Sequence, residues 1–411
     1  MLPLTTTRER AGFKDVFRVG EFRALWLAYL VSVIGDQLAL VAVTVLVYQR
    51  TRSPLLAALA YSAGFLPWAL GGVQLSRLAD KYPRRAVMVA CDSARVVFVA
   101  IMAIPGMPLL VMVLLLACVT LLDSPFRAAR SAMLPDVVSG DHYVMATATM
   151  QITNRIGRTA GFGVGGAIVA VVGAREALLI DAGTFVVSAL VVRLGVRSRP
   201  AHPKERTPER INIVRKVFGD PRLRTLMLLG WMVPFYAVPE GVAAPYAHML
   251  HGGATATGLV LAAGPAGGIV GTLIFSRLVA PERRLRWMGP LAVCTPAVLC
   301  LCFVTPPLAA SLIIFAASTA FSSYQLAANS AFVIAVPPSW RGHAYGLANS
   351  GINVGQSAWF AAAGAVASAV SPAVVIGASG LIGTVVAATL AVAWRRLPAS
   401  PEDSPEAAGH G

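Results

Sequence analysis

Residues 76–80 read SRLAD and residues 276–280 read SRLVA, so one short pattern recurs about 200 residues further along the chain. A second pair, AARSA at 128–132 and AANSA at 327–331, recurs at nearly the same interval. Each copy follows a long apolar stretch. In a membrane protein, two similar halves place a binding site between them, as in alternating-access transporters.

The composition indicates an all-α membrane protein. The 411 residues are 56% hydrophobic and 13% charged, with a mean hydropathy of +0.69, whereas soluble domains carry about 25% charged residues. Twelve apolar runs reach or approach the roughly 18 residues that cross a bilayer, and they lack the alternation of barrel strands. We therefore expect twelve transmembrane helices in two pseudo-symmetric six-helix bundles. The expected spans are Phe22–Tyr48, Pro54–Leu75, Ala86–Ile104, Met107–Pro125, Ile152–Val172, Ala177–Val192, Leu226–Met249, Gly258–Val279, Trp287–Thr305, Pro307–Val336, Gly342–Val370 and Pro372–Trp394.

A charged, proline-rich stretch at 195–224 interrupts the apolar pattern. We expect a cytoplasmic linker there, with a short amphipathic helix near Ile211–Phe218 lying on the membrane. The linker separates an N-terminal bundle at 22–194 from a C-terminal bundle at 225–396. Residues 1–21 form the expected cytoplasmic N-terminal segment. The tail at 397–411 is expected to be disordered, because it has few apolar residues.

The net charge of +15 is distributed unevenly along the chain. With the N-terminus inside, 28 of the 34 Lys and Arg residues fall in inside connections, Arg127 and Arg130 among them, and only Arg50, Arg52 and Arg175 fall outside. This positive-inside bias predicts a multi-pass plasma-membrane protein with both termini in the cytoplasm. The basic excess therefore reflects topology and attraction to anionic lipid, and we expect no nucleic-acid partner.

No pattern for an enzyme or a cofactor stands in a plausible context. HExxH, GxSxG and P-loop motifs are missing, so we expect no enzyme and no ATP hydrolysis. The five cysteines lie in apolar spans without ligand spacing, which argues against a metal site. The expected partners are a small-molecule substrate, protons and the lipid bilayer, and we expect a monomer.

Seven segments, in order, carry a family resemblance. They are GDQLALVAVTVLVYQRTRSP (35–54), SRLADKYPRR (76–85), CDSAR (91–95), ARSAMLPDVV (129–138), GRTAGFGVGG (157–166), DAGTFVVSAL (181–190) and RGHAYGLANSGINVGQ (341–356). Over residues 15–396 the chain resembles major facilitator superfamily transporters of the enterobactin-exporter-like and macrolide-efflux-like branch. The resemblance implies the major facilitator fold and secondary active transport, usually outward, of amphipathic small molecules in exchange for protons.

The loop after the second span resembles the superfamily motif G-x-L-A-D-R-x-G-R-[RK]. The motif is matched at Leu78, Ala79, Asp80, Lys81, Arg84 and Arg85, while Ser76 and Pro83 replace its glycines. A carboxylate beside cations at a helix end can form charge-assisted bonds. The resemblance implies a cytoplasmic gate at Asp80, Lys81, Arg84 and Arg85, to which Arg127 and Arg130 contribute. The alternative is a solvated loop. Ala280 stands at the matching place in the second half, so we expect an asymmetric gate.

Gly157, Gly161 and Gly165 share one helix face, and Gly166 extends it. Small residues allow two helices in lipid to approach closely. The four glycines also resemble the superfamily's antiporter motif, G-x-x-x-G-P-x-x-G-G, with Phe162 in place of the proline. The resemblance implies an export-associated hinge, and ordinary helix packing is the alternative.

Charged residues inside apolar spans need a partner, a water-filled cavity or a function. Asp36 lies half-way along the first span and is the leading candidate for proton coupling, with a structural carboxylate as the alternative. Glu240, between Pro239 and Gly241, is the second candidate, on a cavity wall or in an outer turn.

The other charges in these spans have more ordinary expected roles. We expect Asp92 and Arg95 to form a local ion pair, because they lie three residues apart on a helix. Asp123 and Arg127 are expected toward the cytoplasmic end of the fourth span. Asp181 is expected to cap the start of the sixth span.

Polar stripes along several spans must face protein or water. They predict either hydrogen bonds between helices or the lining of a central substrate cavity. The candidate lining residues are Tyr29, Ser32, Gln37, Gln151, Asn154, Arg155, Arg158, Gln325, Asn329, Asn349, Asn353 and Gln356.

Three functions remain open on the sequence. The leading hypothesis is proton-coupled efflux of a hydrophobic or amphipathic compound such as a drug, an antibiotic, a siderophore or another secondary metabolite. An importer or an uncoupled facilitator is the alternative within transport. A membrane sensor or scaffold without flux is less favoured, because the intramembrane carboxylates and the loop motif are retained.

Overall fold

The computed structural model describes residues 13–65, 75, 78–139, 141–199, 212–337 and 339–397, and every regular element within these ranges is a helix. In that part of the chain, eight helices are long and apolar enough to cross a membrane, and a pair bent by 44° (Pro221–Gly241 with Ala243–Met249) makes a ninth. Three further helical segments bring the arrangement into agreement with twelve spans. They are α3 (Pro54–Ser62) together with α5 (Leu78–Lys81), α6 (Arg84–Met102) and α19 (Arg341–Ala367).

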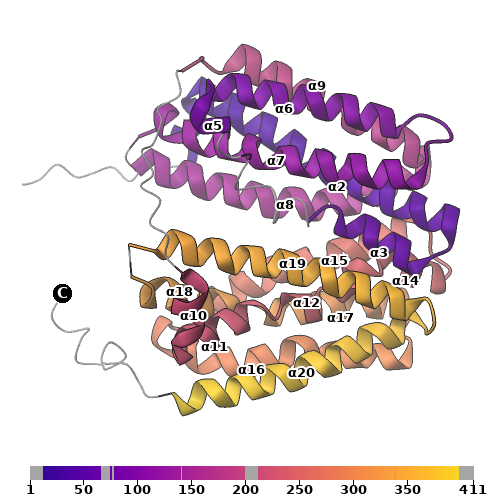
Figure 1. Cartoon of the computed structure of the whole chain (residues 1–411), viewed down its shortest axis with the longest axis vertical. Helices are drawn as coiled ribbons and strands as arrows, with labels where there is room; N and C mark the ends of the chain where they lie inside the picture. The colour runs from indigo at the N-terminus through magenta and orange to yellow at the C-terminus, as the bar shows by residue number, and fades with distance from the viewer. Residues whose placement is uncertain are drawn as a thin grey trace, which may run out of the picture.

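The N-terminal bundle follows the short helix α1 (Phe13–Arg18). Its long helices lie side by side in one half of the molecule (Figure 1). They are α2 (Gly20–Thr51), α3 (Pro54–Ser62) with α5 (Leu78–Lys81), α6 (Arg84–Met102), α7 (Leu109–Val137), α8 (Asp141–Val172) and α9 (Ala174–Gly195).

Helix α10 (Ile213–Gly219) lies within the expected linker, where the sequence predicts a short helix, and it leads into the C-terminal bundle. Residues 200–211 of the expected linker lie outside the described ranges. The seventh span is broken by Pro234, Pro239 and Pro245, since proline removes a helix hydrogen bond. Its pieces are α11 (Pro221–Gly230), α12 (Val233–Tyr236), α13 (Val238–Gly241) and α14 (Ala243–Met249). The bundle continues with α15 (Ala254–Leu278), η1 (Pro281–Arg283), α16 (Arg284–Ala297), η2 (Val298–Val304), α17 (Leu308–Phe321), α18 (Tyr324–Ala335), α19 (Arg341–Ala367) and α20 (Pro372–Arg396).

The fourth span runs well beyond its expected end at Pro125. Helix α7 continues to Val137 with Pro125 and Pro135 inside it. Neighbouring helices and local adjustments tolerate proline within a membrane helix, so proline was a poor end signal here. In consequence Arg127 and Arg130 lie within a long helix rather than in a connection.

The two bundles meet at the end of the molecule that is remote from the linker. There α8 packs on α15, and α3 packs on α19 (Figure 1). Gly166 and Gly258 lie so close that a Cβ on Gly166 would come within 2.7 Å of the Gly258 Cα. One cluster of buried apolar residues spans both bundles at this end, whereas the two other clusters each belong to a single bundle.

Candidate functional site

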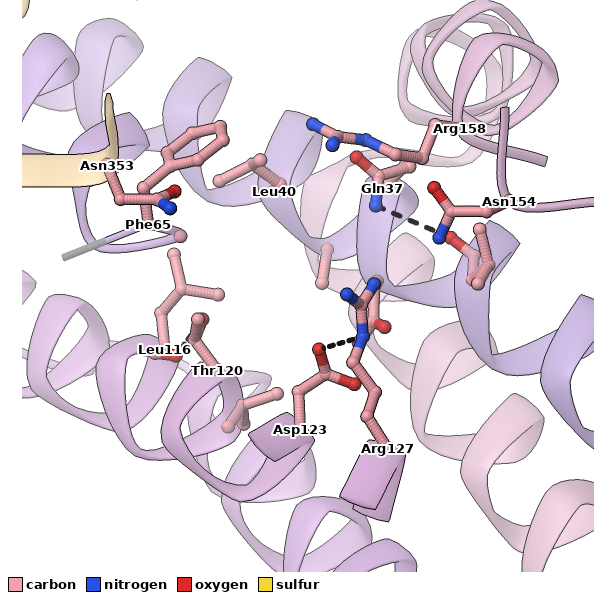
Figure 2. A pocket seen from close by; sticks show the side chains of 15 residues that line it. Gln37, Leu40, Phe65, Leu116, Thr120, Asp123, Arg127, Asn154, Arg158 and Asn353 are labelled. Atoms are coloured by element: carbon pink, nitrogen blue, oxygen red, sulfur yellow. Dashed lines mark hydrogen bonds and ion pairs between the residues drawn. The ribbon is translucent and has the colours of Figure 1, made fainter. Parts of the chain in front are cut away.

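A cavity of about 210 Å³ lies between the bundles, bounded by α2, α7, α8 and α19. On the side of the N-terminal bundle, the cavity is lined by Asp36, Asp123 and Arg127. Asn353 of the C-terminal bundle lies across the cavity from Asn154 and Arg158 (Figure 2). The cavity is partly open, and Asn353 is the residue that the C-terminal half contributes to its described lining.

A second cavity of about 420 Å³ adjoins the first, because Arg127 and Asn154 line both. Its other polar walls come from the linker-side halves of α7 and α8 and from Tyr29 of α2. The volume falls in the range of about 300–1,000 Å³ that accepts drug-sized molecules. The remaining polar lining residues are Arg130, Ser131, Tyr143, Thr147, Gln151 and Arg155.

Beneath Asp36 the N-terminal bundle holds a chain of charged side chains. Arg127 Nε lies 2.7 Å from Asp123, and the fully buried Arg95 lies 3.2 Å from Asp123 and 3.7 Å from Asp92. Ser188 Oγ donates a hydrogen bond of 2.6 Å to Asp92. The expected local pair Asp92–Arg95 is thus present, and Arg95 also links it to α7.

Asp181 does not cap a helix, so that prediction is wrong. Helix α9 begins at Ala174, and Asp181 lies inside it, fully buried, with Thr184 Oγ1 donating to its carboxylate at 3.1 Å. A Cβ on Gly35 of α2 would meet this carboxylate. The sixth span begins three residues earlier than predicted, which moves Asp181 away from the start.

Glu240 connects the two bundles. Tyr61 of α3 donates a hydrogen bond of 3.0 Å to the Glu240 carboxylate, and Arg158 interacts electrostatically with both groups. Glu240 lies in α13, in the broken seventh span.

Within the described part of the chain, no group of three or more His, Cys, Asp or Glu side chains is arranged to hold a metal ion.

The predicted cavity residues separate into several groups. Asp36, Gln37, Asn154, Arg158 and Asn353 line the first cavity, and Tyr29, Gln151, Asn154 and Arg155 line the second. Gln325 and Asn349 instead make hydrogen bonds within the C-terminal bundle, where Gln325 Nε2 donates to Tyr236 at 3.1 Å and Asn353 Nδ2 donates to the Asn349 carbonyl at 2.8 Å. Ser32 and Gln356 are buried without lining either cavity, and Asn329 is exposed.

The family model described as Major Facilitator Superfamily matches residues 25–359. The chain belongs to the Major Facilitator Superfamily. Enterobactin exporter EntS of Citrobacter koseri is 29% identical over 275 residues, which cover 64% of each chain. Multidrug efflux pump Tap of Mycolicibacterium fortuitum is 26% identical over 272 residues, covering 62% of this chain and 66% of that protein. The match thus spans slightly less than two thirds of these curated relatives.

Solved structures of other transporters share the fold. A bacterial homolog to the human lysosomal transporter Spinster, in an inward-facing and occupied conformation, has a TM-score of 0.72 at 16% identity, covering 92% of this chain and 98% of that one. A bacterial homologue of the iron transporter ferroportin, in an inward-facing state, has a TM-score of 0.65 at 15% identity and covers 91% and 99%. Membership of the superfamily and the apolar helices of this chain together make it a multi-pass membrane protein.

The arginines of the superfamily loop motif make their hydrogen bonds and ion pair with the N-terminal bundle. Arg84 forms an ion pair with Asp136 and donates to the Ala132 carbonyl at 2.7 Å, while Arg85 donates to the Val196 carbonyl at 3.2 Å. Lys81 is exposed, and the side chain of Asp80 lies outside the described part of the structure. Arg127 and Arg130 line the cavities, on the same helix α7 whose end contacts Arg84.

The superfamily glycines on α8 face two different helices. Cβ atoms on Gly157, Gly161 and Gly165 would approach Val33, Gln37 and Leu38 of α2 at 3.0, 2.9 and 3.2 Å. Gly166 instead faces Gly258 of α15, in the other bundle. One glycine stripe therefore sets both the packing within a bundle and the contact between bundles.

Several hydroxyl-bearing residues of the site are not predicted from the sequence, Tyr61 and Thr120 among them. Tyr61 links the bundles through Glu240, and Thr120 lines the first cavity. Their only signal is a hydroxyl group inside an apolar span. Such a group is usually satisfied by its own helix, as Thr120 is by the Leu116 carbonyl at 3.0 Å.

Proposed function

We propose that this protein is a secondary active transporter that exports an amphipathic small molecule in exchange for protons by alternating access. The observation that carries the proposal is the cavity between the bundles, lined by Asp36 from one half and Asn353 from the other. The names of the relatives, an enterobactin exporter and a multidrug efflux pump, favour export. Drugs, antibiotics, siderophores and other secondary metabolites are the substrate classes to test.

Orientation follows from the uneven distribution of basic residues, which favours a plasma-membrane protein with cytoplasmic termini. With that orientation, the end at which the bundles touch is the outer end, and the cavities are on the path from the cytoplasm. The conformation is then the one that loads substrate from the cell interior. We propose a monomer as the working unit, because each chain contains both halves of the cavity.

Sidedness gives a direct test of this topology. In a variant without native cysteines, a cysteine at Glu205 in the linker is expected to react with an impermeant maleimide only in inverted vesicles. A cysteine at Gly253, in the connection before α15, is expected to react only in intact cells. Labelling of both positions from the same side would contradict the twelve-span arrangement.

Flux separates the candidate functions. Inverted membrane vesicles containing the full chain are given a pH gradient and a panel of labelled amphipathic compounds. An exporter exchanging protons accumulates one of them only when the vesicle interior is acidic. An uncoupled facilitator equilibrates the compound regardless of the gradient, an importer releases preloaded compound, and a sensor or scaffold moves none.

The loop after α3 supplies a test of the proposed cytoplasmic gate. Asp80→Asn keeps the size of the side chain but removes the charge that can pair with arginines. We expect the transport rate to fall about tenfold while equilibrium binding of substrate persists, because a charge-assisted hydrogen bond contributes about 1.5–3 kcal/mol. The matched control is Asp15→Asn in α1. A wild-type rate for Asp80→Asn at normal expression would rule the gate out.

A further inference from the structure

The two cavities carry an excess of arginine, all of it from one bundle. Arg127, Arg130, Arg155 and Arg158 line their walls from α7 and α8, against the carboxylates of Asp36 and Asp123. The C-terminal bundle offers no matching cation. Between residues 225 and 396 its Lys and Arg residues stand only at helix ends and connections, namely Arg277, Arg283, Arg284, Arg286, Arg341, Arg395 and Arg396.

Most of these cavity arginines have no carboxylate within ion-pair distance in the described part of the chain, although Arg158 interacts electrostatically with Glu240 and Arg130 with Asp123. Asp123 is shared by Arg127 and the buried Arg95. In the part of the chain that the structure describes, Arg130, Arg155 and Arg158 form no ion pair. Arg130 is held in place by the Tyr29 ring, 3.4 Å from its guanidinium carbon. Its buried Nη1 atom, like the Nε atom of Arg158, has no hydrogen-bond partner.

Unpaired guanidinium groups beside a cavity favour one class of ligand. Arg130 and Arg158 are half-buried, and Arg155 is exposed. Partial burial of a cation without a partner is unfavourable, and a ligand that supplies a carboxylate, phenolate or phosphate oxygen relieves that cost through paired hydrogen bonds. In the first cavity the wall across from Arg158 has a different chemistry: Asn353 presents an amide that donates to the Asn349 carbonyl, and no charge lies nearby on α19. The second cavity, which holds Arg130 and Arg155, is lined by the N-terminal bundle and adjoins the first at Arg127 and Asn154. The site is therefore cationic on one side and neutral on the other.

We propose that the substrate is an amphipathic anion, whose acidic group binds among Arg130, Arg155 and Arg158 while its neutral body lies against the C-terminal bundle. This inference rests on the proposed transport function and specifies its substrate class. It disfavours lipophilic cations, because they would enter a space in which arginines outnumber carboxylates two to one.

Binding of three probes that differ in charge tests the proposal. The full chain is purified into nanodiscs of zwitterionic lipid and titrated with pyrenebutyrate, pyrenebutyramide and pyrenebutyl-trimethylammonium, with pyrene anisotropy as the readout. We expect the anion to bind at least about tenfold more tightly than the amide, and the cation most weakly. Raising the salt concentration should weaken binding of the anion alone.

Substitutions then locate the anion. Arg130→Gln should weaken pyrenebutyrate about tenfold and change pyrenebutyramide less than twofold, and Arg130→Lys should restore much of the difference. Arg277→Gln at the exposed end of α15 is the matched control, because it removes an arginine outside both cavities. It should leave all three affinities unchanged.

Several outcomes would overturn the proposal. They are equal affinity for acid and amide in the unsubstituted protein, tighter binding of the cation, no binding of pyrenebutyrate, or a loss in Arg130→Gln that is the same for acid and amide. The vesicle flux assay keeps the two proposals apart. Transport of cations alone would overturn the anion inference and leave export standing, whereas arginine-dependent anion binding without any flux would do the reverse.

Discussion

Replacing Asp36 with asparagine is expected to abolish proton-driven export and to leave substrate exchange measurable. Asp36 lines the cavity, half-way along α2, beside the Asp123–Arg127 pair. One proton moving down about 100 mV supplies roughly 2.3 kcal/mol, enough for a several-tens-fold substrate gradient at unit stoichiometry. Asp123, the other carboxylate of this cavity, is paired with Arg127 and Arg95. Asp36→Asn therefore removes the carboxylate on the described cavity wall that has no ion pair, and that drive is lost, while binding and rocking of the bundles need no proton. Accumulation and exchange are measured in the same proteoliposomes.

Glu240→Gln is the matched comparison, because it removes the buried carboxylate that interacts with Arg158 of the cavity wall and tests the alternative carrier. The substitution removes the negative charge from the Tyr61–Glu240 contact between the bundles. We therefore expect slower transport with uphill accumulation retained. If Asp36→Asn still accumulates substrate in a pH-dependent way and Glu240→Gln does not, the proton is carried by Glu240 and Asp36 is structural.

Leucine at Gly166 is expected to lower transport at least tenfold by opening the contact between the bundles. A Cβ added at Gly166 would come within 2.7 Å of the Gly258 Cα and of the Ala254 carbonyl oxygen. Overpacking costs about 1–3 kcal/mol, and each 1.4 kcal/mol shifts a two-state population tenfold. The state closed at this end should therefore become rare.

The readout is the accessibility of Ser62, a buried residue at the contact between α3 and α19 whose hydroxyl lies 3.4 Å from the Ser357 carbonyl. A cysteine there should react with an external maleimide in Gly166→Leu but not in the parent. Gly183→Leu is the control, because no atom lies within 4 Å of a Cβ at that position. Normal transport by Gly166→Leu would show that the close contact is not needed.

The lengths of the apolar segments predicted the fold class, because a helix needs a minimum number of consecutive apolar residues to cross a bilayer. This requirement holds whichever apolar side chains the segment contains. Helix ends were less predictable. Pro125 ends an apolar segment, but α7 continues beyond it to Val137. Asp181 was expected near a helix start because the sixth span was expected to begin at Ala177, whereas α9 begins at Ala174. In lipid, neighbouring helices compensate for a proline or a charge, and the sequence of a single helix does not contain those neighbours.

The candidate site was predicted in its residue types and less well in its geometry. Asp36, Asn154 and Asn353 line the cavity, because polar groups in apolar spans have few other places to lie. Arg127 and Arg130 were assigned to a connection near the loop at Arg84, because the fourth span was expected to end at Pro125. They instead lie within α7 and line the cavities. The Tyr61–Glu240 contact joins residues 179 positions apart, and no local pattern encodes such a pairing.

The ionic core of the N-terminal bundle also affects how the chain is assembled during synthesis. Helix α6 carries Asp92 and Arg95 and is not among the helices apolar enough to cross a membrane by themselves. Each such charge costs about 2.5–3.5 kcal/mol at the centre of an isolated helix. Its partners Asp123 and Ser188 are translated later, on α7 and α9. The third helix therefore becomes stable in lipid only after the fourth and sixth have emerged, whereas α16, its counterpart in the second half, has no charge along its apolar length and can insert when it is made.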